Sequence, residues 1–346
     1  MSSSLKTFLQ YLVILAATAL LIWFSLRGLH VAEGENKWGY LKHTWDSAHK
    51  GWLLLMAVIA MASHVVRAER WRMLLTPLGE SPKLSHSFFS LMVGYLVNLV
   101  IPRGGEVSRC YNLYKLDKIP VEISFGTVVL ERIVDVLCLL ILIAFSFILE
   151  SQKLFAFIET LPIGQGDHQS KYTVLIYLLG SVLVLGSIGI WFVRKNKKLN
   201  AWVMKTWHGF KDGVLSVFKL KSKGLFIFHS VLIWLLYFAM SYAVIKAFPA
   251  TSELGFHAVL SLFAIGSIAM AAPLPGGTGS YHVLVPQGLV FLYAIPQSDA
   301  VAFTFIFHGW QTFIMIVAGA ISLVATSFLV KRGADPSSKE IHPIKD

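Results

Sequence analysis

Three charged residues, Glu131, Arg132 and Asp135, interrupt the otherwise apolar run VVLERIVDVLCLLILIAF at 128–145. A charge at bilayer depth costs roughly 2.5–3.5 kcal/mol on insertion scales, so intramembrane charges usually pair or serve a transported species. Glu131 and Asp135 are four residues apart and share a helix face, while Arg132 and Asp135 are three apart and can pair. The pattern is typical of a transport site. It is equally typical of a structural ion network near the cytoplasmic end, from which Arg132 can reach the interface.

A second candidate site is the sequence PRGGE at 102–106, which follows another apolar run. If a short helix starts at its last residues, the free N–H groups and the positive dipole end form an anion site. Arg103 and Arg109 would flank that site, and a guanidinium group matches phosphate bidentately. We therefore expect a phospholipid headgroup here, with Glu106 holding an amino group or pairing with Arg109. The simpler alternative is a tight glycine turn with arginines on lipid phosphates at the interface.

A matching break, PLPGGTG at 273–279, contains Gly276 and Gly277 and is followed by His282. His308 lies on the last apolar stretch, three residues before Gln311. A histidine in such a position is more often an interhelical hydrogen-bond partner, worth about 0.6 kcal/mol on average, than a proton carrier. Both histidines are candidate cavity residues that rank below the arginines and carboxylates.

The elements that must position these residues are membrane helices. With 55% hydrophobic and 14% charged residues over 346 positions, the chain is too apolar for a soluble globule. We predict an all-α, polytopic transmembrane helix bundle with one domain at 1–330 and a polar, disordered cytoplasmic tail at 331–346. Six full-length spans are predicted at 8–26, 51–70, 124–149, 173–194, 225–247 and 300–330, and shorter apolar stretches lie at 84–101, 256–272 and 281–295.

The distribution of lysine and arginine orients these segments. The loop 194–223 is strongly basic, with Asp212 as its one acid, so it should be cytoplasmic. By the same rule 67–83 and 102–122 are both cytoplasmic, as are the two termini. The stretch 84–101 should then enter the membrane from the cytoplasm, and the chain should return to the same side as a second short helix from Glu106 onward. This makes a re-entrant hairpin, with two short crossings as the alternative. Two hairpins broken at proline and glycine and entering from opposite faces are typical of an inverted-repeat transporter. Kinked helix pairs are the alternative.

Several other chemistries are not indicated. Cys110 and Cys138 have no paired spacing, so neither a redox motif nor a zinc cluster is predicted. The GGTGS segment lacks the P-loop lysine, and HExxH is absent. We expect no cofactor, no metal and no catalytic residue. The net charge of +11 arises from loops that the positive-inside rule explains, so anionic lipid is the expected partner rather than nucleic acid. The sequence leaves open whether the protein forms a homo-oligomer.

Four segments in order resemble a known family. RWRMLL (70–75), NLVIPRGGEVSR (98–109), ERIVD (131–135) and PLPGGTGSYH (273–282) are similar to motifs of the transmembrane flippase region of lysylphosphatidylglycerol synthases, which also occurs as a free-standing membrane protein. The likeness covers about residues 50–330. It implies a bundle with re-entrant helices that moves a phospholipid between leaflets. The fused aminoacyl-transferase domain has no counterpart after Val330, so synthase activity is not expected.

The resemblance also implies site residues by motif position. These are Arg70, Asn98, Pro102, Arg103, Glu106, Arg109, Glu131, Arg132, Asp135, Pro275, Gly276 and Gly277. Many relatives carry glutamate where this chain has His282, which favours a different lipid or a pH-sensitive site.

The expected function is that of a multi-pass lipid flippase of the inner or plasma membrane, acting on an anionic or aminoacylated phospholipid. Two other classes stay open. One is a membrane-embedded enzyme acting on lipid headgroups, with Glu131, Asp135, His282 or His308 as acid and base. The other is a non-transporting partner of an envelope enzyme.

Overall fold

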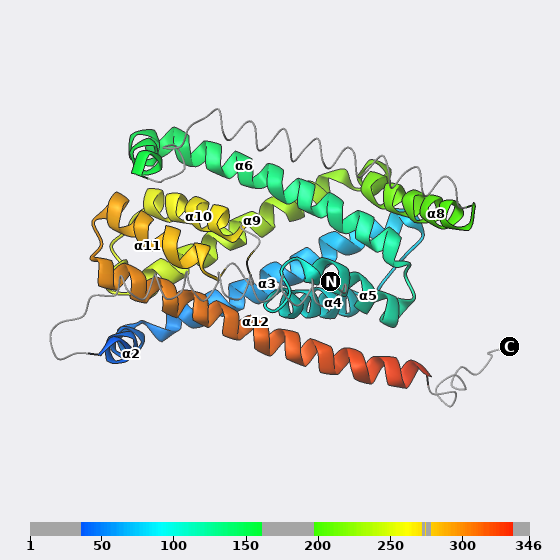
Figure 1. The fold of residues 1–346 in the computed structure, drawn as a ribbon, viewed down its shortest axis with the longest axis horizontal. Coiled ribbons are helices and arrows are strands. Elements are labelled where there is room, and N and C mark those ends of the chain that lie inside the picture. The colour runs from blue at the N-terminus through cyan, green and yellow to red at the C-terminus, as the bar shows by residue number, and fades with distance from the viewer. Residues whose placement is uncertain (1–35, 161–196, 272–273, 275–277, 335–346) are drawn as a thin grey trace, which may run out of the picture.

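The protein is a helical bundle (Figure 1). Its structure, a computed structural model, describes residues 36–160, 197–271, 274 and 278–334. Across these residues the chain forms ten α-helices and two short 3₁₀ helices, without a β-strand, and the predicted all-α class is confirmed. The predicted spans 8–26 and 173–194 lie outside the described residues, as does most of the predicted tail.

Within the described residues, four helices are long and apolar enough to cross a membrane. They are α3 (Lys50–Leu75), α6 (Val121–Thr160), α9 (Lys223–Ala247) and α12 (Gln297–Ala334). Even α9, with 25 residues, is about 37 Å long at 1.5 Å per residue, which exceeds the roughly 30 Å of hydrocarbon in a bilayer. These four match four of the predicted spans, so the chain is a multi-pass membrane protein.

The helix α3 extends beyond its predicted end at residue 70 and stops at Leu75, where the 3₁₀ helix η1 (Thr76–Leu78) follows. Arg67 and Arg70 were counted both at the end of the predicted span 51–70 and in the basic segment 67–83, and their place in a loop is wrong, while the cytoplasmic side of this segment stays a prediction. Both arginines lie on α3 and are buried.

The first hairpin consists of α4 (Leu84–Asn98) and α5 (Gly104–Asp117). Arg103, directly before α5, has a left-handed backbone conformation with φ of 62°. The two helices approach closely because Gly94 faces Gly105, where an added Cβ would lie 2.1 Å from the Gly94 carbonyl oxygen. Glycine at 105 is therefore required for this packing.

The second hairpin consists of α10 (Phe256–Ala271) and α11 (Ser280–Tyr293). Its helices follow the predicted stretches 256–272 and 281–295 closely. Pro275, Gly276 and Gly277 of the connecting break lie outside the described residues.

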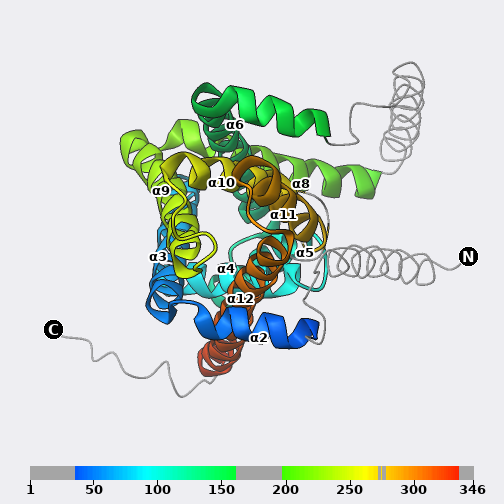
Figure 2. The same ribbon diagram turned by 90° about the vertical axis from the view of Figure 1, so that its left-hand side faces the viewer.

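The order long helix, hairpin, long helix occurs twice, in α3–α6 and in α9–α12. In Figure 1 the first hairpin lies in one half of the bundle and the second hairpin in the other. Figure 2, viewed along the bundle, shows the helices arranged around a central region. The inverted repeat that the sequence predicts would show this order of elements, and it stays a prediction. The re-entrant assignment of the hairpins stays a prediction.

Two helices were not predicted, α2 (Lys37–Ser47) and α8 (Lys197–Val214), the latter followed by η2 (Leu215–Lys219). Helix α2 is tied to α12 by the Tyr40 hydroxyl, which donates to Asp299 at 2.5 Å. Helix α8 lies against α6. Neither contains a long apolar run, so a search for spans overlooks both.

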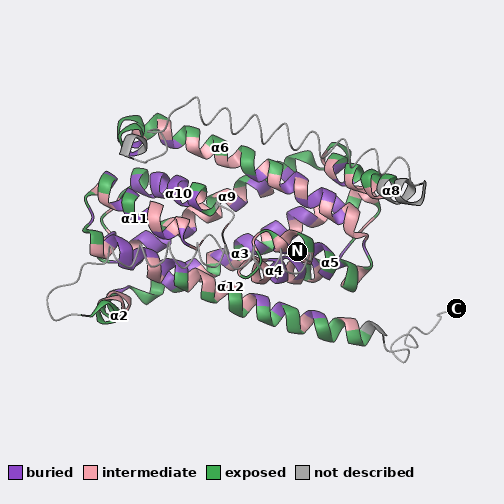
Figure 3. Cartoon of the chain, viewed as in Figure 1, coloured by how far each residue is buried: buried purple, intermediate pink, exposed green. Residues whose placement is uncertain are grey.

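The largest hydrophobic cluster joins α3, α9, α10, α11 and α12, with residues such as Met56, Val244, Val259, Leu289 and Phe303 buried in it. Figure 3 shows buried residues facing inward and exposed ones on the outer faces. Large apolar side chains on those outer faces include Ile141, Leu235 and Phe328, each at least 60% exposed. A surface of this kind suits lipid rather than water.

Candidate functional site

Seven charged side chains gather where α3, α5 and α6 meet. We call them the charge cluster: Arg67, Arg70, Glu106, Arg109, Glu131, Arg132 and Asp135. At its centre, Asp135 accepts from Nη2 of Arg67 and from Nη2 of Arg70, both at 2.8 Å. Glu131 pairs with Arg109 at 2.6 Å and more loosely with Arg70 at 3.4 Å. The two carboxylates thus share one helix face, as their spacing predicted.

Arg109 is held in a fixed position inside the protein. Its guanidinium lies 4.7 Å from the centre of the Trp71 ring, whose indole N–H donates to Thr127 at 2.9 Å. The Arg109 side chain is only 2% exposed. The expectation that Arg109 flanks an open anion site is therefore not met, because this arginine is a buried partner of Glu131.

The outer layer of the charge cluster is more accessible. Arg132 is half-buried and lies 3.5 Å from Glu106 and 3.7 Å from Asp135. Its pairing with Asp135 agrees with their spacing. Glu106, in contrast, contacts Arg132 rather than Arg109. Two carboxylates thus hold Arg132 at the edge of the cluster.

Asn98 has a structural role at the break of the first hairpin. Its side-chain oxygen accepts from the backbone N–H of Gly105 at 2.7 Å. This bond satisfies one of the free N–H groups at the start of α5. Arg103 lies beside it and is exposed. One of the backbone N–H groups that were expected to bind an anion is therefore already satisfied within the protein.

The charge cluster has an excess of positive charge. Four arginines face three carboxylates, which leaves one unit of positive charge. Desolvated charges are costly unless they are paired. A negatively charged group placed against Arg67, Arg103 and Arg132 would complete the balance.

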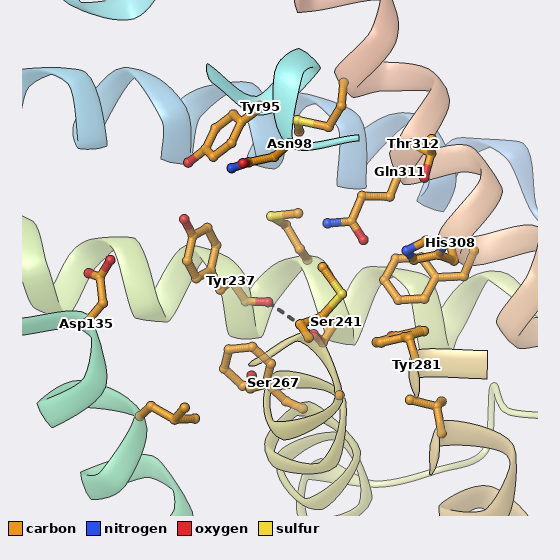
Figure 4. Close-up of a pocket in the computed structure, with 18 of the residues that line it drawn as sticks. Tyr95, Asn98, Asp135, Tyr237, Ser241, Ser267, Tyr281, His308, Gln311 and Thr312 are labelled. Carbon is orange, nitrogen blue, oxygen red and sulfur yellow. Dashed lines mark hydrogen bonds between the residues drawn. The ribbon is translucent and has the colours of Figure 1, made fainter. Parts of the chain in front are cut away.

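A cavity of about 520 Å³ opens onto this cluster, and we call it the central cavity. Its volume is within the usual range of about 300–1,000 Å³ for ligand sites. Figure 4 shows Tyr95 and Asn98 of α4, Asp135 of α6 and Tyr237 of α9 around it. Among the residues that line it, Arg67, Arg103, Glu106, Arg132 and Asp135 form a charged end.

The opposite end of the central cavity is polar but uncharged. It is lined by Tyr281 of α11 and by His308, Gln311 and Thr312 of α12 (Figure 4). Apolar side chains line the region between the two ends, among them Leu139, Met240, Val244, Leu262 and Phe263. Residues of both hairpins line the cavity, so it lies between the two hairpins.

The central cavity also reaches the outer surface of the bundle. Val136 of α6 and Met270 near the end of α10 line it and are 53% and 41% exposed. Arg103 lines it as well and is exposed. Because Val136 and Met270 are apolar, this opening presents an apolar rim beside a cationic one.

The two candidate histidines lie together. Their ring centres are 4.8 Å apart, and His308 stacks on Tyr281 at 5.4 Å. His282 is buried, does not line the central cavity, and accepts from the N–H of Gly279 at 3.4 Å. His308 is thus a cavity residue, while His282 supports the start of α11.

Sequence reasoning missed the part of the site on α3 and α9, which includes His64, Arg67, Trp234 and Tyr237. His64, Arg67 and Arg70 follow one another at intervals of three, which is the spacing of one helix face. That pattern was the available signal. In the described part of the chain no group of three or more histidine, cysteine, aspartate or glutamate side chains could hold a metal ion.

Comparisons with known proteins agree with this architecture. Over 304 residues the chain is 23% identical to UPF0104 membrane protein MJ1595 of Methanocaldococcus jannaschii, covering 82% of this chain and 86% of that protein. No solved structure matches. The family model for the lysylphosphatidylglycerol synthase TM region matches residues 7–319. The chain therefore belongs to the lysylphosphatidylglycerol synthase TM region family.

Proposed function

We propose that this protein is a lipid flippase of the plasma membrane that moves a phospholipid with an anionic headgroup between the leaflets, with both termini in the cytoplasm. One observation supports this most: the central cavity joins a charged end with excess positive charge to an apolar rim at the outer surface. The charged end suits the anionic headgroup of a phospholipid, and the apolar rim suits its acyl chains. A soluble anion would need only the charged end.

The headgroup phosphate is placed against Arg67, Arg103 and Arg132. Charge-assisted hydrogen bonds from arginine to phosphate are roughly twice as strong as neutral ones and often bidentate. The phosphate also supplies the negative charge that the charge cluster lacks, so its desolvation is compensated within the protein. The acyl chains remain outside, next to Val136 and Met270.

Transport requires a second conformation that opens toward the other leaflet. The repeated arrangement of the two hairpins supports this requirement, because inverted repeats commonly alternate between two related states around a site at their interface. The central cavity lies at that interface.

The test is leaflet exchange in liposomes. Purified protein is reconstituted with phosphatidylglycerol labelled on an acyl chain, and exchange is followed by quenching of the outer leaflet. Arg103→Ala should slow exchange by about tenfold or more, because a hydrogen bond to a charged group contributes roughly 1.5–3 kcal/mol. Arg72→Ala is the matched control, since Arg72 pairs with Glu69 on α3 and does not line the cavity.

Unchanged exchange in Arg103→Ala would exclude this site for the phosphate. No exchange by the wild-type protein would argue against the flippase function itself. Mass spectrometry of the same lipids separates transport from headgroup chemistry, since an enzyme changes the headgroup mass and a flippase leaves it unchanged.

A further inference from the structure

Helix α8 lies across the bundle rather than along it. The four apolar spans follow the long axis of the bundle in Figure 1, where α8 lies at the end at which α6 begins. Figure 2, viewed along the bundle, shows α8 from its side. Because the spans cross the membrane, α8 runs along the plane of the membrane.

The end of the bundle that carries α8 lies at the height of the lipid headgroups. The 3₁₀ helix η2 and a short turn join α8 to α9, which begins at Lys223. With 25 residues α9 is about 37 Å long, only about 7 Å more than the hydrocarbon layer of roughly 30 Å. This excess is divided between the two ends of α9. The start of α9 and the preceding η2 therefore lie in the headgroup layer.

Large apolar side chains are exposed on α8 and η2. Met204 and Trp207 lie on α8, and Leu215 and Phe218 lie on η2. In each pair the residues are three apart, which is the spacing of one helix face. We call these four residues the outer row, and they are between 37% and 72% exposed. In water this surface would be unfavourable, whereas at a membrane interface tryptophan and phenylalanine are common.

The inner side of α8 is packed tightly on α6. An added Cβ at Gly213 would lie 2.5 Å from the carbonyl oxygen of Ile123, and one at Gly126 would lie 2.3 Å from that of Phe210. Backbones this close require glycine at both positions. Because its inner side is fixed in this way, α8 cannot rotate to bury the outer row against α6.

Lysines accompany the outer row. Residues 204–223 contain five lysines and one acid, Asp212. Asp212 pairs with Lys219 at 3.3 Å. Lys211, Lys221 and Lys223 are exposed and add positive charge that this segment does not balance. Lysines at a membrane surface attract anionic headgroups.

We propose that α8 and η2 bind the headgroup layer of an anionic membrane leaflet, with the outer row at the boundary of the acyl chains and the lysines on the lipid phosphates. This surface is separate from the central cavity, because no described residue from 204 to 223 lines it. The inference does not depend on lipid transport. A soluble acidic partner would match the lysines, but α8 and η2 lie where lipid headgroups already are.

The experiment measures which lipid surrounds α8. The full-length protein receives a cysteine in place of His208, an exposed residue beside Trp207, and a fluorophore is attached there. It is reconstituted in mixed vesicles of phosphatidylcholine and phosphatidylserine. A doxyl quencher is carried on the upper acyl chain by either the one lipid or the other, at the same mole fraction.

We expect quenching by the phosphatidylserine form to be about fivefold stronger than by the phosphatidylcholine form, because the attraction of one lysine to an anionic surface corresponds to about that factor. High salt should lower this quenching ratio, since it screens exposed charges. Wild-type protein taken through the same labelling corrects for Cys110 and Cys138. A fluorophore at Leu235→Cys, an exposed apolar position within α9, should show no preference between the two quenchers.

Variants then test the lysines. Lys211→Gln together with Lys221→Gln should lower the quenching ratio at residue 208 toward that at residue 235. Lys37→Gln together with Lys42→Gln is the matched control. It removes the same charge from α2, at the other end of the bundle in Figure 1, and should leave the ratio unchanged.

Equal quenching of the residue 208 fluorophore by the two lipids would overturn the preference of this surface for anionic lipid. Absence of quenching by either lipid would place α8 in water and overturn the membrane contact, in favour of a soluble partner. A ratio that persists in high salt or in the folded lysine variant would overturn the role of the lysines. If that variant does not fold, the salt series and the comparison with residue 235 decide.

Discussion

Removing the charge of Glu131 should destabilise the protein strongly. Glu131 is fully buried and is the carboxylate that contacts Arg109, at 2.6 Å. In Glu131→Gln, Arg70 keeps its bond to Asp135 at 2.8 Å, but Arg109 loses its counter-charge. Leaving one buried charge unpaired costs about 3–5 kcal/mol. At roughly 2 °C per kcal/mol for a chain of this size, the unfolding temperature should fall by about 6–10 °C.

The measurement is thermal unfolding in detergent, followed by tryptophan fluorescence, as a double-mutant cycle. Arg109→Gln together with Glu131→Gln removes both charges and leaves two neutral amides, so it should recover at least half of the lost stability. Glu69→Gln is the matched control. It breaks the partly exposed pair with Arg72 and should cost less than about 1 kcal/mol.

Two results would refute this reasoning. One is a Glu131→Gln protein that unfolds within about 2 °C of wild type, which would mean that Arg109 finds another partner or water. The other is a double variant no more stable than the single one. In that case the loss would come from packing around Glu131 rather than from an unpaired charge.

Three further predictions follow from single contacts. Gly105→Ala should cost about 1–3 kcal/mol or more in thermal unfolding, since its Cβ would meet the Gly94 carbonyl oxygen at 2.1 Å, whereas Gly224→Ala has open space and should cost nothing. Ser230→Ala removes a hydrogen bond from a buried arginine and should lower the unfolding free energy by about 1.5–3 kcal/mol, less than Glu131→Gln does. Glu150→Ala should speed hydrogen exchange at the end of α11, measured by mass spectrometry, because it removes an acceptor of the Tyr293 hydroxyl at 2.7 Å; unchanged exchange would show that this bond does not hold α11.

The sequence predicted the hairpins well because their ends are set by local chemistry. Proline and glycine stop a helix wherever they occur in such a run, so α4 and α10 end within a few residues of the predicted 101 and 272. The helix-face spacing of Glu131, Arg132 and Asp135 likewise located the acidic half of the charge cluster. These features depend on neighbours within one or two turns.

The pairing of Arg67 and Arg70 with Asp135 was beyond such reasoning. The positive-inside rule counts basic residues along the sequence, and it therefore placed both arginines in the basic cytoplasmic segment 67–83. Their partner Asp135 is 65 or more residues away, and only the packing of α3 against α6 brings them together. Glu106 was expected to hold an amino group or to pair with Arg109, three residues away. In the structure it contacts Arg132 of α6 instead, a partner that only the packing of α5 against α6 supplies.

The two halves of the bundle are alike in backbone arrangement and different in charge. Each ion pair of the charge cluster joins residues of α3, α5 and α6, so the cost of desolvating these groups is balanced within the first half. The second hairpin lines the central cavity with uncharged residues, from Leu262 on α10 to Val285 on α11. Its displacement would separate no ion pair of the cluster.

Glu150, at the kink of α6, joins both helices of the second hairpin to α6 by hydrogen bonds. Its Oε2 accepts from Ser261 of α10 at 2.8 Å and from Tyr293 of α11 at 2.7 Å. Both bonds lie at the end of the hairpin away from its break, so they can act as a pivot while the broken end near Met270 moves. The flippase function proposed above would need this combination: fixed charges to hold the phosphate, and an uncharged element whose movement changes which leaflet the cavity faces.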